Sequence, residues 1–204
     1  MKNFTIILIC IFISAAASVS AQKIVKKSGD MKFLKGQKAI DLKFDYEKMG
    51  VGKFNTEEEY INEKVTEHNK KETGKGDKWK DGWINAREKH YEPKFEELAN
   101  KYLEKYSVSI VKDNSAAKTT CIVKTTFIEP GFNVGVMKKP AFCNYEFLFY
   151  DNSSPDKILA KLQLTNVPGS QMSGYDFDAS ARISESYAKA AKILAKYLEK
   201  EVYQ

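Results

Sequence analysis

The sequence is poor in the residues that most often build catalytic and metal centres. It has two histidines and three cysteines among 204 residues. His68 and His90 are too far apart to form the close-spaced pair of common zinc motifs. No serine stands in a Gly-x-Ser-x-Gly turn, and Gly74 and Gly76 lack the framing of a phosphate-binding loop. The sequence therefore predicts no catalytic residue, no metal ligand and no cofactor.

Long apolar runs are also missing beyond the first 21 residues. There, Lys2 precedes an apolar core at 6–13, and small residues at 18–21 precede a possible cut, which is typical of a secretory signal peptide. The core is shorter than the roughly 20 residues that span a membrane. Ile9 before Cys10 is not the small residue of a lipoprotein signal. We expect cleavage near Ala21, a mature chain from Gln22, and a periplasmic or extracellular location.

The charge is mixed, with 33 basic against 27 acidic residues and a net charge of +6. Such a surplus suits weak attraction to anionic polymers or lipid headgroups, or reflects only a solvated surface. Lysine greatly outnumbers arginine and no nucleic-acid recognition motif is present. We expect no nucleic-acid partner and no transmembrane segment.

The second half of the chain predicts three strands and a helix. Residues 119–128 are β-branched throughout, 142–150 are rich in aromatics, and 157–166 alternate with Ile158, Ala160, Leu162 and Leu164 on one face. The residues at 151–156 favour a turn, which makes the last two strands a hairpin. Residues 179–202 carry an apolar stripe at helical spacing, expected to cover the sheet. Asp176, Asp178 or Ser180 could cap this helix.

The first half predicts a strand and a run of helices. After a basic amino-terminal arm or loose first strand at 22–36, alternation at 38–46 indicates a strand. Helices follow at 56–71 with a capping box at Thr56 and Glu59, at 77–91 and, with Pro93 in the first turn, at 93–106. A short strand follows at 108–111. The order β-α-α-α-β-β-β-β-α predicts a single α+β domain at 37–204, with a mostly antiparallel sheet of about five strands and helices on one face.

Cys121 and Cys143 remain after removal of the signal. An oxidising compartment favours a disulfide, but an antiparallel pairing of 119–128 with 142–150 places the two cysteines at opposite ends of the hairpin. Cys121 should then face a residue near Leu148, on the order of 15 Å from Cys143. We predict two free, buried thiols.

Two features are candidate binding sites. Trp79 and Trp83 stand four residues apart on a helix, so their rings share one side. Exposed, they would form a platform that binds sugar rings or the apolar surface of a partner. The alternative is that both are ordinary core residues. The second is the segment 130–140, which places Phe132, Val134 and Met137 among glycines. It is either an exposed contact loop or an extension of the neighbouring strands.

The second half resembles a superfamily of bacterial periplasmic domains. It is similar in element order and in Ile-Glu-Pro-Gly at 128–131, Phe-Leu-Phe-Tyr-Asp at 147–151, Ile-Leu-Ala at 158–160 and Ala-Lys-Ala-Ala-Lys-Ile-Leu at 188–194. The superfamily includes the amino-terminal domain of TolB, the periplasmic domain of the curli secretion lipoprotein and lipoprotein activators of peptidoglycan synthases. The resemblance covers 94–199 and implies a non-enzymatic role in envelope assembly or partner binding.

These observations together predict a secreted, non-enzymatic binding or accessory protein of the bacterial cell envelope. Its partner would be an envelope protein or a glycan. The alternative is a glycoside hydrolase or another enzyme acting on envelope polysaccharide, which would need a cleft with two facing carboxylates.

Overall fold

The computed structural model describes residues 24–134, 137–169 and 179–204. The predicted signal peptide with its cleavage near Ala21, and the proposed capping residues Asp176 and Asp178, lie outside this part of the chain. Within it, no helix is long and apolar enough to cross a membrane.

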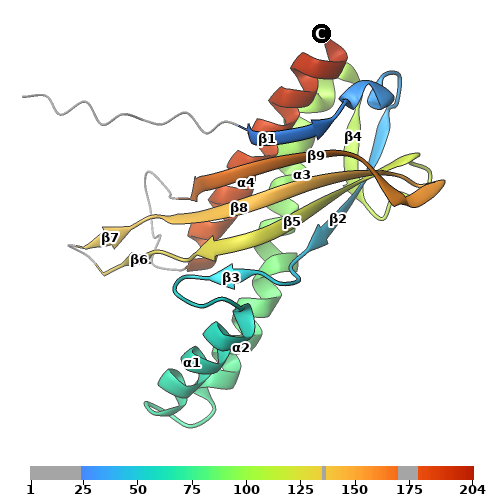
Figure 1. Ribbon diagram of the computed structural model, residues 1–204. Helices are drawn as coiled ribbons and strands as arrows, with labels where there is room; N and C mark the ends of the chain where they lie inside the picture. Colours follow the sequence, from blue (N-terminus) through green and yellow to red (C-terminus); the bar gives the residue numbers. More distant parts are fainter. Residues whose placement is uncertain (1–23, 135–136, 170–178) are drawn as a thin grey trace, which may run out of the picture.

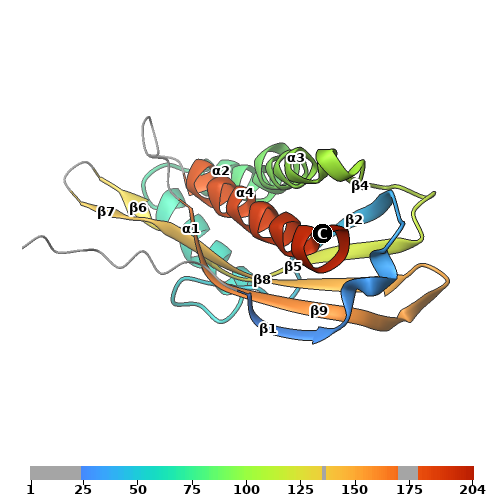
Figure 2. The same cartoon turned by 90° about the horizontal axis from the view of Figure 1, so that it is seen from above.

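The fold is α+β, with a large main sheet and helices on one of its faces (Figures 1 and 2). The seven strands of this sheet are β1 (Ile24–Gly29), β2 (Ala39–Asp45), β3 (Gly50–Val51), β4 (Ser109–Lys112), β5 (Thr119–Glu129), β8 (Ala141–Asp151) and β9 (Ser154–Gly169). The helices are α1 (Glu57–Asn69), α2 (Lys75–Ala86), α3 (Glu92–Leu103) and α4 (Ala179–Leu198), with short 3-10 turns at η1 (Met31–Leu34) and η3 (Glu104–Tyr106).

The sheet corrects the prediction of about five mostly antiparallel strands. Its order is β1-β9-β8-β5-β2-β4, with β3 also beside β5. The pairs β1–β9, β9–β8 and β8–β5 are antiparallel, whereas β5–β2, β2–β4 and β3–β5 are parallel. The helices α1 to α3 lie between β2 and β4 in the sequence. A helical crossover of this length returns the chain in the same direction, which permits parallel pairing.

The lysine-rich segment at 22–36 contains the edge strand β1, which pairs with β9 from Ile24 to Gly29. The 3-10 turn η1 follows directly, and its Met31 and Leu34 are buried in the core. Of the two alternatives, a basic arm or a first strand, the described part of this segment is therefore a strand. Met31 and Leu34 anchor the turn that follows it in the core.

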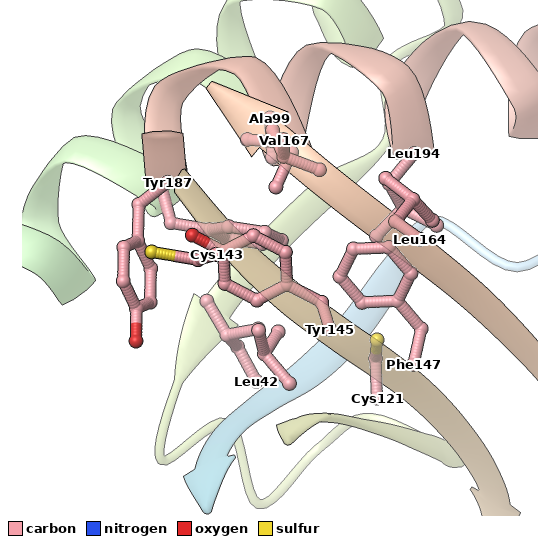
Figure 3. Packing of buried hydrophobic residues seen from close by; sticks show 14 of the residues in the cluster. Leu42, Ala99, Cys121, Cys143, Tyr145, Phe147, Leu164, Val167, Tyr187 and Leu194 are labelled. Carbon is pink, nitrogen blue, oxygen red and sulfur yellow. The ribbon is translucent and has the colours of Figure 1, made fainter. Parts of the chain in front are cut away.

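The strands β5 and β8 pair as predicted, and both cysteines are free and buried (Figure 3). Cys121 lies opposite Phe149 and Cys143 opposite Ile128, so the two thiols are separated along the ladder. Both point into the core beside Tyr145 and Phe147. Burial raises the pKa of the Cys143 thiol to about 11 and raises that of Cys121 further.

One strand position differs from the prediction. Ala160, Leu162 and Leu164 of β9 are buried, but Ile158 is 48% exposed. The ladder between β8 and β9 shifts at this point: Phe149 pairs with Ala160, and the next residue, Tyr150, pairs with Ile158. A bulge of this kind breaks the strict alternation of faces, which sequence alternation alone does not reveal.

The two predicted helices at 77–91 and 93–106 form one continuous rod. A π-helical turn, η2 (Arg87–Tyr91), joins α2 to α3 without a loop. Pro93 follows in the first turn of α3. Proline lacks an N–H and its ring crowds the carbonyl four residues before it. A wider turn at this point accommodates the proline without ending the helix.

The helices α3 and α4 lie side by side over the sheet, and α4 packs on β8 and β9 (Figure 2). The predicted stripe is confirmed along α4, where Ile183, Tyr187, Ala190, Leu194 and Leu198 are buried, whereas Val202 beyond its end is only partly buried. A last π-helical turn, η4 (Glu199–Tyr203), continues it. The hairpin of α1 and α2 projects beyond the end of the sheet (Figure 1).

Candidate functional site

The segment between β5 and β8 forms a small hairpin that projects from the end of the sheet (Figure 1). Its strands are β6 (Phe132–Asn133) and β7 (Lys138–Lys139), which pair only with each other. Phe132 lies opposite Lys139, and the Val134 N–H donates to the Met137 carbonyl at 3.0 Å. We call residues 131–134 and 137–140 the tip hairpin. Its residues are paired strand, as one of the two alternatives expects, but they form a separate two-stranded ladder beyond Pro130 and Pro140 rather than a part of the main sheet.

The pairing places the apolar side chains of the tip hairpin on one face. Residues directly opposite each other in an antiparallel pair share a face, and faces alternate along each strand. Phe132, Val134 and Met137 therefore lie on one face, with Lys139 at its base. The opposite face carries Asn133 and Lys138. The tip hairpin is thus amphipathic across its thickness.

This apolar face is open to solvent. Phe132, Val134 and Met137 are 43%, 61% and 60% exposed. Only two other large apolar side chains in the described residues are comparably exposed, and these, Val25 and Ile158, lie on β1 and β9. Exposed apolar residues scattered singly need no explanation, but a group on one projecting element indicates a contact surface.

A kink separates the tip hairpin from the sheet. Proline cannot donate to a ladder, so Pro130 and Pro140 interrupt the pairing that ends at Glu129 and Phe142. Gly131 has a φ of +62°, and a Cβ on it would stand 2.2 Å from the Lys139 carbonyl oxygen. Only glycine combines this backbone conformation with so close an approach.

A buried arginine of α4 donates hydrogen bonds to the backbone of this kink. Arg182, in the first turn of α4, is 3% exposed. Its Nε donates to the Pro130 carbonyl at 3.2 Å and its Nη2 to the Gly131 carbonyl at 3.3 Å. A guanidinium satisfies two diverging acceptors at once. It therefore occupies carbonyls that the interrupted ladder leaves open.

Glu129 holds the tip hairpin from the sheet side. We call Gly131, Arg182 and Glu129 together the mount of the tip hairpin. Its Oε1 accepts from the Gly131 N–H at 3.1 Å, and its Oε2 accepts from the Lys139 ammonium at 2.9 Å. One carboxylate thereby connects both strands of the tip hairpin to the end of β5. The orientation of the tip hairpin is set by this pair of charged residues, together with Gly131.

The tryptophan pair lies elsewhere, between α1 and α2. The two rings stack at 5.8 Å with an interplanar angle of 20°, as their spacing predicts. Trp83 is 8% exposed and also contacts Tyr60 at 5.0 Å. Trp79 is partly buried and stacks against His68 at 5.6 Å. Trp83 thus has the packing of a core residue, whereas Trp79 keeps part of its ring at the surface.

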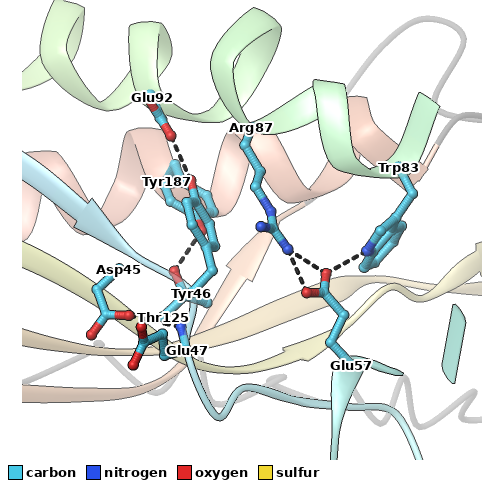
Figure 4. Close-up of polar contacts among 9 residues, drawn as sticks. All are labelled: Asp45, Tyr46, Glu47, Glu57, Trp83, Arg87, Glu92, Thr125 and Tyr187. Carbon is cyan, nitrogen blue, oxygen red and sulfur yellow. Dashed lines mark hydrogen bonds and ion pairs between the residues drawn. The ribbon is translucent and has the colours of Figure 1, made fainter. Parts of the chain in front are cut away.

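Trp83 is also fixed by a hydrogen bond (Figure 4). Its Nε1–H donates to Glu57 Oε1 at 2.6 Å, and the same carboxylate binds Arg87 Nη2 at 2.5 Å. The Arg87 guanidinium in turn lies 4.2 Å from the centre of the Tyr46 ring. This network joins α1, the helical rod and the end of β2. It therefore fixes the α1–α2 hairpin against the sheet, which is a structural role for Trp83.

A cavity of about 370 Å³ opens beside the tryptophans. It lies between the helical rod and the start of α4, and its walls include Trp79, Trp83, Asn85, Lys89, His90 and Ser180. Its mixture of indole, amide and basic groups could accommodate a polar ligand. The tip hairpin is not part of its lining, so the two sequence-predicted features are separate sites.

The described residues contain no group of three or more His, Cys, Asp or Glu side chains that could hold a metal ion. His68 and His90 lie on different elements, α1 and η2. A second cavity of about 390 Å³ is lined by Glu88, Glu92, Glu96 and Glu97. These carboxylates all come from one helical rod rather than from facing walls. Glu92 is already paired with Lys112 and accepts from the Tyr46 hydroxyl at 3.2 Å.

Glu129 and Arg182, which hold the tip hairpin, were not predicted as site residues from the sequence. One signal could have indicated the latter. Of the 33 basic residues only two are arginines, Arg87 and Arg182. Each is a buried or largely buried residue that binds two acceptors. In a lysine-rich chain a rare arginine marks a position where a planar, two-pronged donor is needed.

No family model and no curated protein matches the sequence. Among solved structures, the chain is similar to the PelC dodecamer from Paraburkholderia phytofirmans, with 13% identity over 90% of this chain and all of that chain, at a TM-score of 0.42. A variant of the same protein matches with 11% identity over the same shares, at a TM-score of 0.41.

Proposed function

We propose that this protein is an exported, non-enzymatic binding or accessory protein of the bacterial cell envelope, and that the tip hairpin is its contact surface. The observation that carries the proposal is the apolar face of Phe132, Val134 and Met137. A monomeric protein gains nothing in stability from three exposed apolar side chains on a projecting ladder. They become favourable only when a partner removes them from water.

The mount supports the same conclusion. A buried arginine is costly to desolvate unless its donors are used, and Arg182 is used to fix the two carbonyls at the kink. Glu129 fixes the other strand. Together, the contacts of Arg182 and Glu129 hold a short ladder in one orientation. Preorganisation of this kind reduces the entropy that a contact surface loses when it binds.

The experiment compares envelope binding of three forms of the exported protein. The first is wild type, the second carries Phe132→Ser, Val134→Ser and Met137→Ser, and the third carries Val25→Ser and Ile158→Ser. The third form is a matched control, because it removes exposed apolar side chains away from the tip hairpin. We expect the first and third forms to co-sediment with isolated cell envelopes and the second to remain in solution. Equal sedimentation of all three would contradict the proposal.

The enzymatic alternative has its own test. The cavity lined by Glu88, Glu92, Glu96 and Glu97 places its carboxylates along one helical rod, and a glycosidase needs an acid and a second carboxylate across the scissile bond. We expect no turnover of chromogenic glycosides by the purified protein. Turnover that is lost in Glu96→Gln would replace the binding proposal with the hydrolase.

A further inference from the structure

We propose that the tip hairpin docks on a lipid surface carrying anionic headgroups, with Phe132, Val134 and Met137 inserted into the interface. This inference rests on the proposed function, because it names the partner of the same surface. The geometry of the tip hairpin, its charge and its small size each favour a lipid bilayer over a protein or a glycan.

The geometry suits a planar interface. All three apolar side chains lie on one face of a short ladder, and the opposite face carries Asn133 and Lys138. An element that is apolar on one face and polar on the other lies in the interfacial plane, with its apolar face toward the acyl chains. The tip hairpin projects beyond the end of the main sheet (Figure 1). It can therefore reach a surface before the body of the protein does.

The charge of the segment matches anionic headgroups. Residues 130–140 contain Lys138 and Lys139 and no aspartate or glutamate. Lys138 is exposed, and a long lysine side chain reaches the headgroups from either face of the hairpin. Lys139 is held by Glu129, so Lys138 is the main free charge of the tip hairpin. Basic residues beside an apolar insertion strengthen binding to anionic lipid and make it sensitive to salt.

The size argues against a protein partner. A stable protein interface buries about 800 Å² on each side, from roughly 20 or more residues. The apolar face of the tip hairpin has three side chains. A glycan partner is disfavoured by chemistry, because sugars need hydrogen-bonding groups beside an aromatic ring, and the one polar side chain on this face, Lys139, is engaged by Glu129. A few apolar side chains with adjacent lysines are enough for reversible binding to a membrane.

The test uses sedimentation with vesicles of phosphatidylethanolamine alone or mixed with phosphatidylglycerol. We expect wild type to bind the mixed vesicles, and the Phe132→Ser, Val134→Ser, Met137→Ser form to lose about a hundredfold in apparent affinity. Lys138→Ala should lose about fivefold on the mixed vesicles and nothing on phosphatidylethanolamine alone. The control with Val25→Ser and Ile158→Ser should bind like wild type.

Two outcomes would overturn the inference: no binding of wild type to either kind of vesicle at low salt, or equal binding by the triple serine form. The result is separable from that of the proposed function. If the protein binds isolated envelopes through the tip hairpin but not pure lipid vesicles, the lipid partner is wrong and the contact surface stands. If the triple serine form also binds envelopes normally, both proposals fail.

Discussion

Truncation of Trp83 separates a packing role from a binding role for the tryptophan pair. The indole is 8% exposed, contacts the Tyr60 and Trp79 rings and donates to Glu57. Removal of a buried tryptophan side chain costs about 3–5 kcal/mol of unfolding free energy. For a chain of this size each kcal/mol lowers the melting temperature by about 2–4 °C. Trp83→Ala should therefore melt about 6–20 °C below wild type.

Two further variants sharpen this prediction. Trp79 is only partly buried, so Trp79→Ala should cost about 1–2 kcal/mol, less than Trp83→Ala. Trp83→Phe keeps a ring but removes the donor to Glu57, and should cost about 1 kcal/mol beyond the lost ring area. Thermal unfolding followed by circular dichroism measures all three. A Trp83→Ala protein as stable as wild type would refute the packing assignment and restore a binding platform.

Three further predictions concern the mount, the thiols and processing. Gly131→Ala should weaken envelope binding without lowering the melting temperature by more than a few degrees, since it displaces the tip hairpin but not the core; unchanged binding would contradict the role of the kink. Native protein should resist alkylation at neutral pH and take up two alkyl groups after denaturation, at Cys121 and Cys143. Burial raises the pKa of the Cys143 thiol from 9.0 to about 11, so this thiol ionises at a lower pH in the unfolded chain than in the folded one. Its contribution to the free energy of unfolding should therefore be complete below pH 9 and fall as the pH rises toward 11. A free energy of unfolding that does not change over this range would contradict the prediction. Amino-terminal sequencing of the exported protein should start at Gln22, and another start would refute the predicted cleavage.

Local patterns predicted the elements whose causes are local. β-branched residues located β5 and aromatic residues located β8, because both residue types favour strands. Alternation of apolar and polar residues located β9 and all of its inner face except Ile158. The capping box located the start of α1, where Thr56 accepts from the Glu59 N–H at 3.2 Å. The stripe of α4 followed from its helical spacing. The register of β5 on β8 was also accessible, since it depends on the length of one connection, and it correctly predicted free cysteines.

Features that depend on distant partners were not accessible. The parallel pairing of β2 with β4 and β5 depends on how three helices return the chain to the sheet. The continuous rod depends on a π-helical turn that absorbs the effect of Pro93, which local rules assign to a helix start. The exposure of Ile158 depends on a bulge. For the candidate site, the rarity of arginine marks Arg182 as a special position, but its partner Gly131 could not be identified because it lies 51 residues away in sequence.

The most direct test of the central claim places a reporter on the tip hairpin. Both native thiols are buried and keep a raised pKa, so an environment-sensitive fluorophore can be attached through Val134→Cys alone. Ile158→Cys provides the matched control at another exposed apolar position. On addition of isolated cell envelopes we expect the emission of the Val134→Cys label to shift to the blue and that of the Ile158→Cys label to stay constant. A constant emission from Val134→Cys, or equal shifts at both positions, would contradict the assignment of the tip hairpin as the contact surface.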